Sequence, residues 1–204
     1  SRSGGGSVTK TLTANGTPQA VVLATTDLSV LGDGLITISA TTRDTAGNTS
    51  ATSFSSFSLD TAAPAAPALS LGSGIADGAS SAEATASSGV ITASAETGST
   101  LSILFSRSGG GSVTKTLTAN GTPQAVVLAT TDLSVLGDGL ITISATTRDT
   151  AGNTSATSFS SFSLDTAAPA APALSLGSGI ADGATAAEAT ASSGVITASA
   201  ETGS

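Results

Sequence analysis

Carboxylates are the residues of this sequence that could do chemistry. The chain contains 14 Asp and Glu residues but no His, Cys or Tyr. Ser-His-Asp and Cys-His catalysis, zinc sites of the usual Cys/His kind and disulfides are therefore excluded. Carboxylates in loops rich in Gly, Ser and Asn can bind Ca²⁺, which takes roughly six to eight oxygen ligands. Such a cation also removes the repulsion between carboxylates that are held close together.

The overall charge and composition exclude several classes of partner. Six basic residues face 14 acidic ones, which gives a net charge of −8. Such a chain repels phosphate backbones and anionic lipid, and it has no Trp or Tyr on which bases could stack. No apolar run approaches the roughly 18 residues that a membrane span needs. We therefore expect no nucleic acid, no membrane insertion and no small-molecule substrate.

The sequence repeats itself with a shift of 105 residues. Residues 1–99 match residues 106–204 at all but two positions, where Ser80 corresponds to Thr185 and Ser81 to Ala186. A unit this long is a whole globular domain rather than one layer of a solenoid.

The best boundary between units is the stretch Asp-Thr-Ala-Ala-Pro-Ala-Ala-Pro at residues 60–67, which returns at 165–172. Two prolines three residues apart favour a stiff, extended linker. Residues 61–165 then form one complete domain, residues 1–60 are the C-terminal part of a repeat, and residues 166–204 are the N-terminal part of the next. We expect the chain to be a window of a longer array. Neither end part can close a core alone, and the two can pair within or between molecules.

Period-2 alternation of apolar and polar residues dominates the unit and predicts strands. The predicted strands are residues 69–71, 91–95, 101–106, 113–118, 125–129, 141–146 and 156–164. Seven short strands in about a hundred residues are typical of an all-β fold, an Ig-like antiparallel β-sandwich, here repeated in tandem.

Three details refine this prediction of the fold. Residues 132–136 could form one helical turn, and no segment has a sustained helical period. Lys115 lies in the middle of a Thr-rich strand and indicates an exposed sheet edge. Phe159 and Phe162 have opposite parity, so a bulge lies between them or one of them faces solvent.

Two motifs carry a resemblance to a known family. They are Asp-Thr-Ala-Gly-Asn at residues 149–153, which follows a predicted strand, and Asp-Thr-Ala-Ala-Pro at 165–169. Together they resemble the bacterial Ig-like extender repeats of giant repeats-in-toxin (RTX) adhesins, and the resemblance covers the whole repeat. It implies a rod of near-identical neighbouring repeats, stiffened by Ca²⁺ at the junctions. It also implies type I secretion and a place on the bacterial cell surface, projecting an adhesive tip for attachment or biofilm formation.

The acidic residues lie at loops or strand ends of the predicted sandwich. At the end where the linker enters, the topology places Asp60 and Thr61 with Glu96, Asp149 and Asn153. At the other end it places Asp77, Glu83, Asp132 and Asp138 near the outgoing Asp165. The equivalent candidates in the incomplete units are Asp33, Asp44 and Asp182. Each linker is therefore bracketed by carboxylates from two domains, and all these residues are candidate Ca²⁺ ligands.

Each candidate also has a plain structural alternative. Residues 149–153 could be an Asx turn with Gly at positive φ, and Asp165 could only cap the linker turn. Asp77 and Asp138 each precede Gly in an ordinary turn pair, and Glu83 and Glu96 could be solvated surface acids. The spacing of an EF-hand is absent, so the Ca²⁺ hypothesis depends on clustering and resemblance.

Function classes other than a structural extender have weaker support. A calcium-dependent glycan- or surface-binding Ig-like module is the alternative, although sugar sites usually present Trp or Tyr faces and this chain has neither. An enzyme would need a carboxylate pair as its catalytic group, and nothing beyond the presence of carboxylates supports one. An ice-binding face would need regular Thr-x-Thr ladders, which are missing. We therefore predict a non-enzymatic extender.

Overall fold

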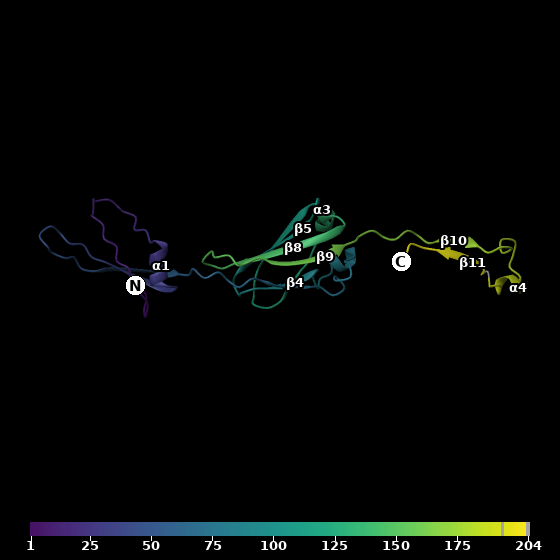
Figure 1. Cartoon of the computed structure of the whole chain (residues 1–204), viewed down its shortest axis with the longest axis horizontal. Coiled ribbons are helices and arrows are strands. Elements are labelled where there is room, and N and C mark those ends of the chain that lie inside the picture. The colour runs from purple at the N-terminus through teal and green to yellow at the C-terminus, as the bar shows by residue number, and fades with distance from the viewer. Residues whose placement is uncertain (193, 203–204) are drawn as a thin grey trace.

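The computed structural model describes residues 1–192 and 194–202 and places three bodies one after another along the chain (Figure 1). The middle body is complete, and extended linkers join it to an incomplete body on each side. Mostly antiparallel strands make up the fold, as the alternation in the sequence predicts.

The central unit contains all seven predicted strands, in two antiparallel sheets that are consistent with an Ig-like repeat. One sheet has the order β3-β4-β7 and consists of Ala68–Leu71, Ile91–Ser94 and Gln124–Val126. The other has the order β6-β5-β8-β9, and its strands β5, β6, β8 and β9 are Thr100–Arg107, Ser112–Thr118, Gly139–Arg148 and Ser158–Leu164. Strand β7 is shorter than the predicted 125–129, because the chain after Val126 leads into a helix.

The core lies between the two sheets and follows the period of the strands. In β8 the apolar Ile141, Ile143 and Ala145 are buried, while Thr142 between them is exposed. The layer continues into the neighbouring strand, where the buried Phe105 of β5 lies opposite Ile143. The burial of apolar surface between the sheets is the main driving force for closing the unit.

The two Phe residues of β9 differ in exposure without a bulge. The strand pairs with β8 in an uninterrupted register, in which Phe162 lies opposite Ile141 and Phe159 opposite Ser144. Phe162 is therefore in the core at 4% exposure, and Phe159 faces solvent at 71%. Of the two explanations open from the sequence, the solvent-facing Phe is the one observed.

Two short helices interrupt the strands of the central unit. Helix α3 (Thr130–Leu136) extends the helical turn predicted at 132–136 and buries Leu133 and Leu136. Helix α2 (Ser81–Ala84) was not expected from the period; it begins at a capping box in which Ser80 and Glu83 bind each other's backbone N–H. Its copy α4 (Ala186–Ala189) begins with Thr185 in the same role, so the Ser-to-Thr difference between repeats preserves the cap.

A backbone contact joins the beginning of the central unit to its end. Ala79 forms a parallel β-bridge with Leu164 at the end of β9. Its N–H donates to the Ser163 carbonyl at 2.8 Å, and its own carbonyl accepts from the Asp165 N–H at 2.9 Å. The last strand is thus fixed to the loop that follows β3.

The incomplete units repeat the sequence but only part of the structure. The first contains α1 (Thr25–Leu31), β1 (Gly34–Ala40) and β2 (Ser53–Leu59), and the last contains β10 (Ala173–Leu176) and β11 (Ile196–Ser199). Residues 7–13 are identical in sequence to β6 but form no strand, whereas β6 pairs with β5 along its whole length. The two end units lie on opposite sides of the central unit (Figure 1), and among residues 1–192 and 194–202 no strand of one pairs with a strand of the other.

Candidate functional site

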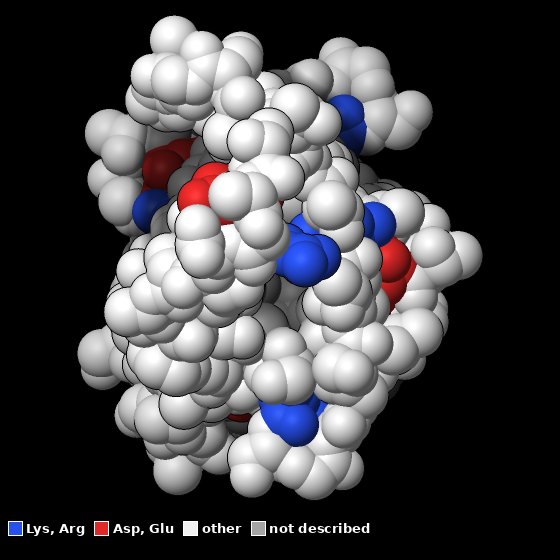
Figure 2. Space-filling view, turned by 90° about the vertical axis from the view of Figure 1, so that its left-hand side faces the viewer, with Lys and Arg blue, Asp and Glu red and all other residues white. Residues whose placement is uncertain are grey.

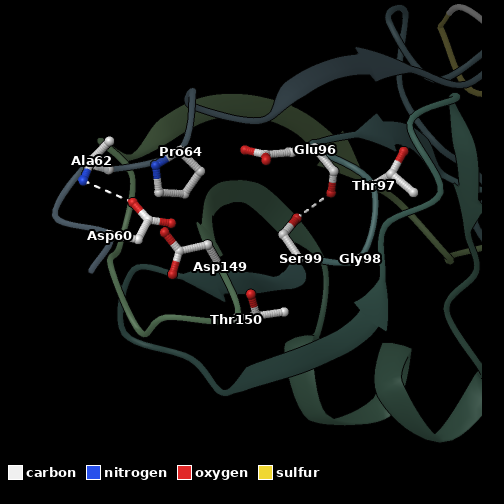
Figure 3. Close-up of a pocket in the computed structure, with 10 residues that line it drawn as sticks. Asp60, Ala62, Pro64, Glu96, Thr97, Gly98, Ser99, Asp149 and Thr150 are labelled. Carbon is white, nitrogen blue, oxygen red and sulfur yellow. Dashed lines mark hydrogen bonds between the residues drawn. The ribbon is translucent and has the colours of Figure 1, made fainter. Parts of the chain in front are cut away.

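The entry of the linker into the central unit forms a pocket of about 170 Å³. Three acidic residues from separate segments line it: Asp60 from the linker, Glu96 from the loop after β4, and Asp149 from the loop after β8. In Figure 3 the carboxyl groups of Asp60 and Asp149 lie next to each other, and Glu96 points toward Pro64. The structure therefore brings together acids that the predicted topology assigned to one end of the sandwich.

The central unit holds the linker through its own hydrogen bonds. The Asn153 side-chain amide donates to the Asp60 carbonyl at 3.1 Å. Further along, the Thr147 hydroxyl donates to the Ala65 carbonyl at 3.3 Å, and the Ser158 hydroxyl donates to the Pro67 carbonyl at 2.6 Å. These contacts satisfy carbonyls of a segment that lies outside both sheets.

The prolines of the linker are buried only where a complete unit follows them. Pro64 and Pro67 are both buried against the central unit. Their copies Pro169 and Pro172 precede the incomplete last unit and are exposed. Because proline fixes φ, a linker whose prolines also pack against a domain has little freedom left.

The preceding unit holds the same linker from the other side. Asp33 accepts through one carboxylate oxygen from both the N–H and the hydroxyl of Thr61, at 2.9 and 2.8 Å. Asp138 accepts from Thr166 in the same way in the next repeat, at 3.0 and 2.8 Å. Asp60 caps the turn that follows it by accepting from the Ala62 N–H at 3.1 Å.

Asp149 and Asn153 form the turn that the sequence left as an alternative to metal binding. One carboxylate oxygen of Asp149 accepts from the Gly152 and Asn153 N–H groups, and the other accepts from the Asn153 side chain. This side-chain hydrogen bond, with the backbone ones, outweighs desolvation and lowers the pKa of the Asp149 carboxyl below its ordinary value. Asp44 and Asn48 repeat the turn in the first unit.

The oxygen donors around the pocket are of the kind that a hard cation binds, but the three carboxylates do not all lie close together. Asp60, Glu96 and Asp149 supply carboxylates, Ser99 and Thr150 supply hydroxyls, and the lining contains no basic residue. Among the residues that the structure describes, however, no three acidic side chains lie close enough together to hold one metal ion. An ion shared by all three would require at least one of these carboxylates to move toward the other two.

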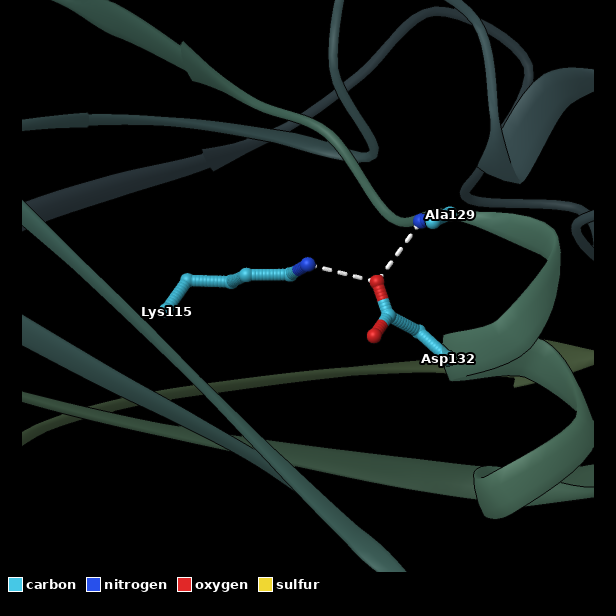
Figure 4. Close-up of polar contacts among 3 residues, drawn as sticks. All are labelled: Lys115, Ala129 and Asp132. Atoms are coloured by element: carbon cyan, nitrogen blue, oxygen red, sulfur yellow. Dashed lines mark hydrogen bonds and ion pairs between the residues drawn. The ribbon is translucent and has the colours of Figure 1, made fainter.

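At the opposite end of the central unit, Asp132 is paired with a base. Lys115 of β6 reaches the Asp132 carboxylate at 2.5 Å, and the same oxygen accepts from the Ala129 N–H at 2.7 Å (Figure 4). Partial burial raises the pKa of this carboxyl, but the hydrogen bonds from Lys115 and Ala129 outweigh that effect and lower it. Asp132 thus stabilises the start of α3 and neutralises the edge-strand lysine, rather than facing a linker.

Among the residues that the structure describes, the other candidates at that end form no group of three that could hold a metal ion. The Glu83 carboxylate accepts from the backbone and hydroxyl of Ser80, which makes it a helix cap. Asp77 is exposed in the turn before Ala79. Asp165 caps the turn after β9 by accepting from the Ala167 N–H at 3.0 Å, and Asp182 is exposed in the last unit.

Some of the residues that hold the linker were not predicted. Thr147 and Ser158 are ordinary strand-end hydroxyl residues among many others, so their type and spacing carried no signal. Asp33 and Asp138 stay predicted metal ligands, and the structure adds that each accepts hydrogen bonds from a linker threonine, Thr61 or Thr166. The separation of 28 residues between each such Asp and its Thr carries no signal of the pairing, because any two residues keep their separation in an identical copy.

The fold and the linker contacts define a protein of antiparallel β repeats in tandem. No protein-family model matches the chain, and neither does any curated protein. A solved structure described as a tetra-tandem repeat in the extending region of a large adhesion protein is 25% identical, with a TM-score of 0.42, and the match covers 74% of this chain and 36% of that one.

A second solved structure belongs to work on host cell surface retention of a 1.5-MDa bacterial ice-binding adhesin. It is also 25% identical, with a TM-score of 0.37, and the match covers 78% of this chain and 50% of that one. The chain thus spans about a third and a half of the length of these two structures.

The helices of the structure are all short. Within residues 1–192 and 194–202, none is long and apolar enough to cross a membrane.

Proposed function

We propose that this chain is part of a structural extender, a non-enzymatic series of repeats that sets the length of a large bacterial cell-surface adhesin. In this role it would project an adhesive tip away from the cell for attachment or biofilm formation. The observation that supports the proposal best is the linker at residues 60–67, which is hydrogen-bonded by the units on both sides and whose prolines are buried.

A spacer works by keeping its units at a fixed separation and orientation. Asp33 holds the start of the linker, and Asn153, Thr147 and Ser158 hold the rest. Each net hydrogen bond of this kind contributes roughly 0.5–1.5 kcal/mol, so several together restrict bending at the junction. Because the repeats are nearly identical in sequence, every junction between complete units would be restricted in the same way.

The experiment compares two triple variants of the full chain. The first, Asn153→Ala with Thr147→Val and Ser158→Ala, removes the three side-chain bonds to the linker. The second makes the matched changes in the first unit, Asn48→Ala with Thr42→Val and Ser53→Ala, where no linker is bound. Because the chain lacks Cys, spin labels can be attached uniquely at Ser56→Cys and Ser161→Cys for distance measurement by pulsed electron paramagnetic resonance.

We expect the distribution of distances between the two labels to be broader in the triple variant of the central unit than in the unchanged chain. In the matched control, the width of this distribution should stay the same. Melting of the central unit, followed by circular dichroism, verifies that the variant is folded at the temperature of measurement. Equal widths for the two triple variants would contradict a junction held by these bonds.

The proposal includes Ca²⁺ at the junction pocket. Asp60, Glu96 and Asp149 are the residues that would bind it, with hydroxyls and carbonyls of the same lining. The support is the gathering of carboxylates from two repeats without a basic residue among the lining groups. A bound cation would neutralise these charges and add a further link between linker and domain.

Calorimetric titration with CaCl₂ and melting in CaCl₂ and in EGTA test this part. At a Ca²⁺ concentration of about 100 times the Kd, one site stabilises the folded state by roughly 2.7 kcal/mol. Glu96→Gln should reduce the calcium-dependent gain, and Asp77→Asn, at the opposite end of the unit, should leave it unchanged. If the Tm is the same in CaCl₂ and in EGTA, the calcium part of the proposal is wrong. The part that depends on the hydrogen-bonded linker would still stand.

A glycan screen with and without Ca²⁺ separates the extender from a calcium-dependent surface-binding module. The extender predicts no binding by these repeats under either condition.

A further inference from the structure

A Gly-rich loop, Arg-Ser-Gly-Gly-Gly at residues 107–111, joins β5 to β6. The Gly110 N–H donates to the Arg107 carbonyl at 3.0 Å, which closes the turn. Basic residues are scarce in this chain, and the view from its N-terminal end shows only scattered charges among uncharged residues (Figure 2). Within the part of the chain that the structure describes, both ion pairs are formed by lysines. Arg107 therefore binds something other than a carboxylate.

The partner of Arg107 is the end of helix α3. The Arg107 Nε donates to the Leu136 carbonyl at 2.6 Å, and Leu136 is the last residue of that helix. Carbonyls in the last turn of a helix have no partner within the helix, and a basic side chain can supply one. Arg107 thus connects the loop between β5 and β6 to the point where α3 ends.

Glycines from two segments leave the space in which the Arg107 side chain lies. A Cβ at Gly110 would be 2.6 Å from the Arg107 Nε. A Cβ at Gly137 would be 3.2 Å from Nη2 of the same side chain, and one at Gly139 would be 3.3 Å from its Cδ. The arginine is therefore enclosed between its own loop and the turn that follows α3.

This turn contains Asp138, the residue that holds the outgoing linker. Asp138 lies between Gly137 and Gly139, whose φ angles are +67° and +130°. Glycine gives the backbone freedom on both sides of Asp138, so the place of its carboxylate depends on what holds the turn. That carboxylate accepts from the N–H and the hydroxyl of Thr166. A displaced turn would loosen both bonds.

The first unit contains the same arrangement. Arg2 is the copy of Arg107, and its Nη1 donates to the Asp33 carbonyl at 2.8 Å. Asp33 in turn accepts from Thr61 through its carboxylate. In both units the arginine thus binds a carbonyl at or just before the turn whose Asp holds a linker.

We propose that Arg107 is a positioning residue of the junction. By fixing the turn of residues 137–139, it keeps the Asp138 carboxylate on Thr166 of the outgoing linker, and the Gly-rich loop supplies the space for it. This role deepens the proposed extender function and depends on it, because the position of a linker matters where the linker sets the separation of units.

Spin labels on the full chain at Ser161→Cys, in β9, and Ala168→Cys, in the linker, measure how the linker leaves the central unit. Both positions are exposed. Arg107→Ala should raise the population in which the linker is released by roughly 2- to 10-fold, the effect of losing one net hydrogen bond. Gly110→Ala should act in the same direction, because its Cβ would occupy the space of the guanidinium.

Two variants serve as matched controls and should leave the distance distribution unchanged. Arg148→Ala removes an arginine at the other end of β8, where its Nε donates to the Gly152 carbonyl. Ser108→Ala changes an exposed residue of the Gly-rich loop itself. Melting followed by circular dichroism verifies that each variant is folded. If Arg107→Ala is unfolded, Arg107→Lys takes its place, since it keeps the charge but lacks the Nε donor.

A double variant tests whether Arg107 acts through Asp138. Asp138→Ala removes the contact with Thr166, so adding Arg107→Ala to it should release the linker no further. Additive effects, or a linker that the Arg107 and Gly110 variants leave in place, would overturn the role of Arg107. If Asp138→Ala alone still releases the linker, the extender proposal stands without that role. If Asp138→Ala has no effect either, the hydrogen-bonded junction of the extender is contradicted as well.

Discussion

The same isoleucine occurs twice in this chain, once inside a closed core and once outside it. We expect Ile143→Ala to destabilise the central unit strongly, and the identical change Ile38→Ala to have little effect on it. Ile143 is fully buried in β8 and lies opposite Phe105, whereas Ile38 is 46% exposed in β1. The pair separates the contribution of tertiary context from that of local sequence, because the neighbouring residues are identical.

The magnitude follows from the burial of the two side chains. Replacing a fully buried Ile by Ala loses the transfer free energy of the deleted carbons and leaves a cavity, at a cost of about 2–5 kcal/mol. For a domain of about one hundred residues, each kcal/mol lowers the Tm by roughly 4–8 °C. Ile143→Ala should therefore lower the Tm by roughly 10 °C or more. Ile38→Ala should change the free energy of unfolding by less than about 0.5 kcal/mol, as is usual outside a packed core.

Guanidinium unfolding followed by far-ultraviolet circular dichroism is the assay, because the chain has no Trp or Tyr to serve as a fluorescent reporter. Equal losses at the two positions would refute the conclusion that the central unit alone has a closed core. A negligible loss at Ile143 would refute the packing of β8 between the sheets.

Three further predictions concern local structure. The pKa of Asp132 is lower in the folded state than its unfolded value near 3.8, so its carboxylate stabilises the fold at pH values above 3.8. This stabilisation is lost as the pH falls through the folded pKa, and Asp132→Asn should therefore reduce the fall in Tm at acidic pH. Gly89→Ala should destabilise the central unit by about 2 kcal/mol or more on denaturant unfolding, since φ is +85° and a Cβ would lie 2.7 Å from the Val126 nitrogen. The copy change Gly194→Ala should leave that transition unchanged. Ser80→Ala should cost about 1 kcal/mol in the same assay through loss of the α2 cap, and Thr185→Ala should not affect the central unit.

The strands were predictable from the sequence because one face of each is buried. Alternation located β5 and β8 to within about two residues, since a half-buried strand must alternate. Helix α2 has no hydrophobic period, but its Ser80 and Glu83 fit the spacing of a capping box and could have been recognised. The end of β7 was predicted too late, because the apolar residues after Val126 continue the pattern while the chain turns toward α3.

The candidate site was predictable in its topology but not in its partners. Loop connectivity alone placed Asp60, Glu96 and Asp149 at one end of the unit. The ion pair of Asp132 with Lys115 depends on a side chain reaching from an edge strand to a helix, which no spacing in the sequence encodes. The backbone also depends on its partners, because residues 7–13 have the sequence of β6 but form no strand, while β6 pairs with β5.

The bridge between Ala79 and Leu164 has a consequence for the molecule under load. Tension along the chain enters the central unit after Pro67 and leaves it after Leu164, at opposite ends of the unit (Figure 1). The two hydrogen bonds of Ala79, to Ser163 and from Asp165, join the loop after the first strand to the last strand in parallel orientation. A pull on the two ends therefore shears these bonds together instead of opening them one at a time. Rupture under force is governed by the unfolding rate, so a mechanical clamp at this position would delay it without adding to the core.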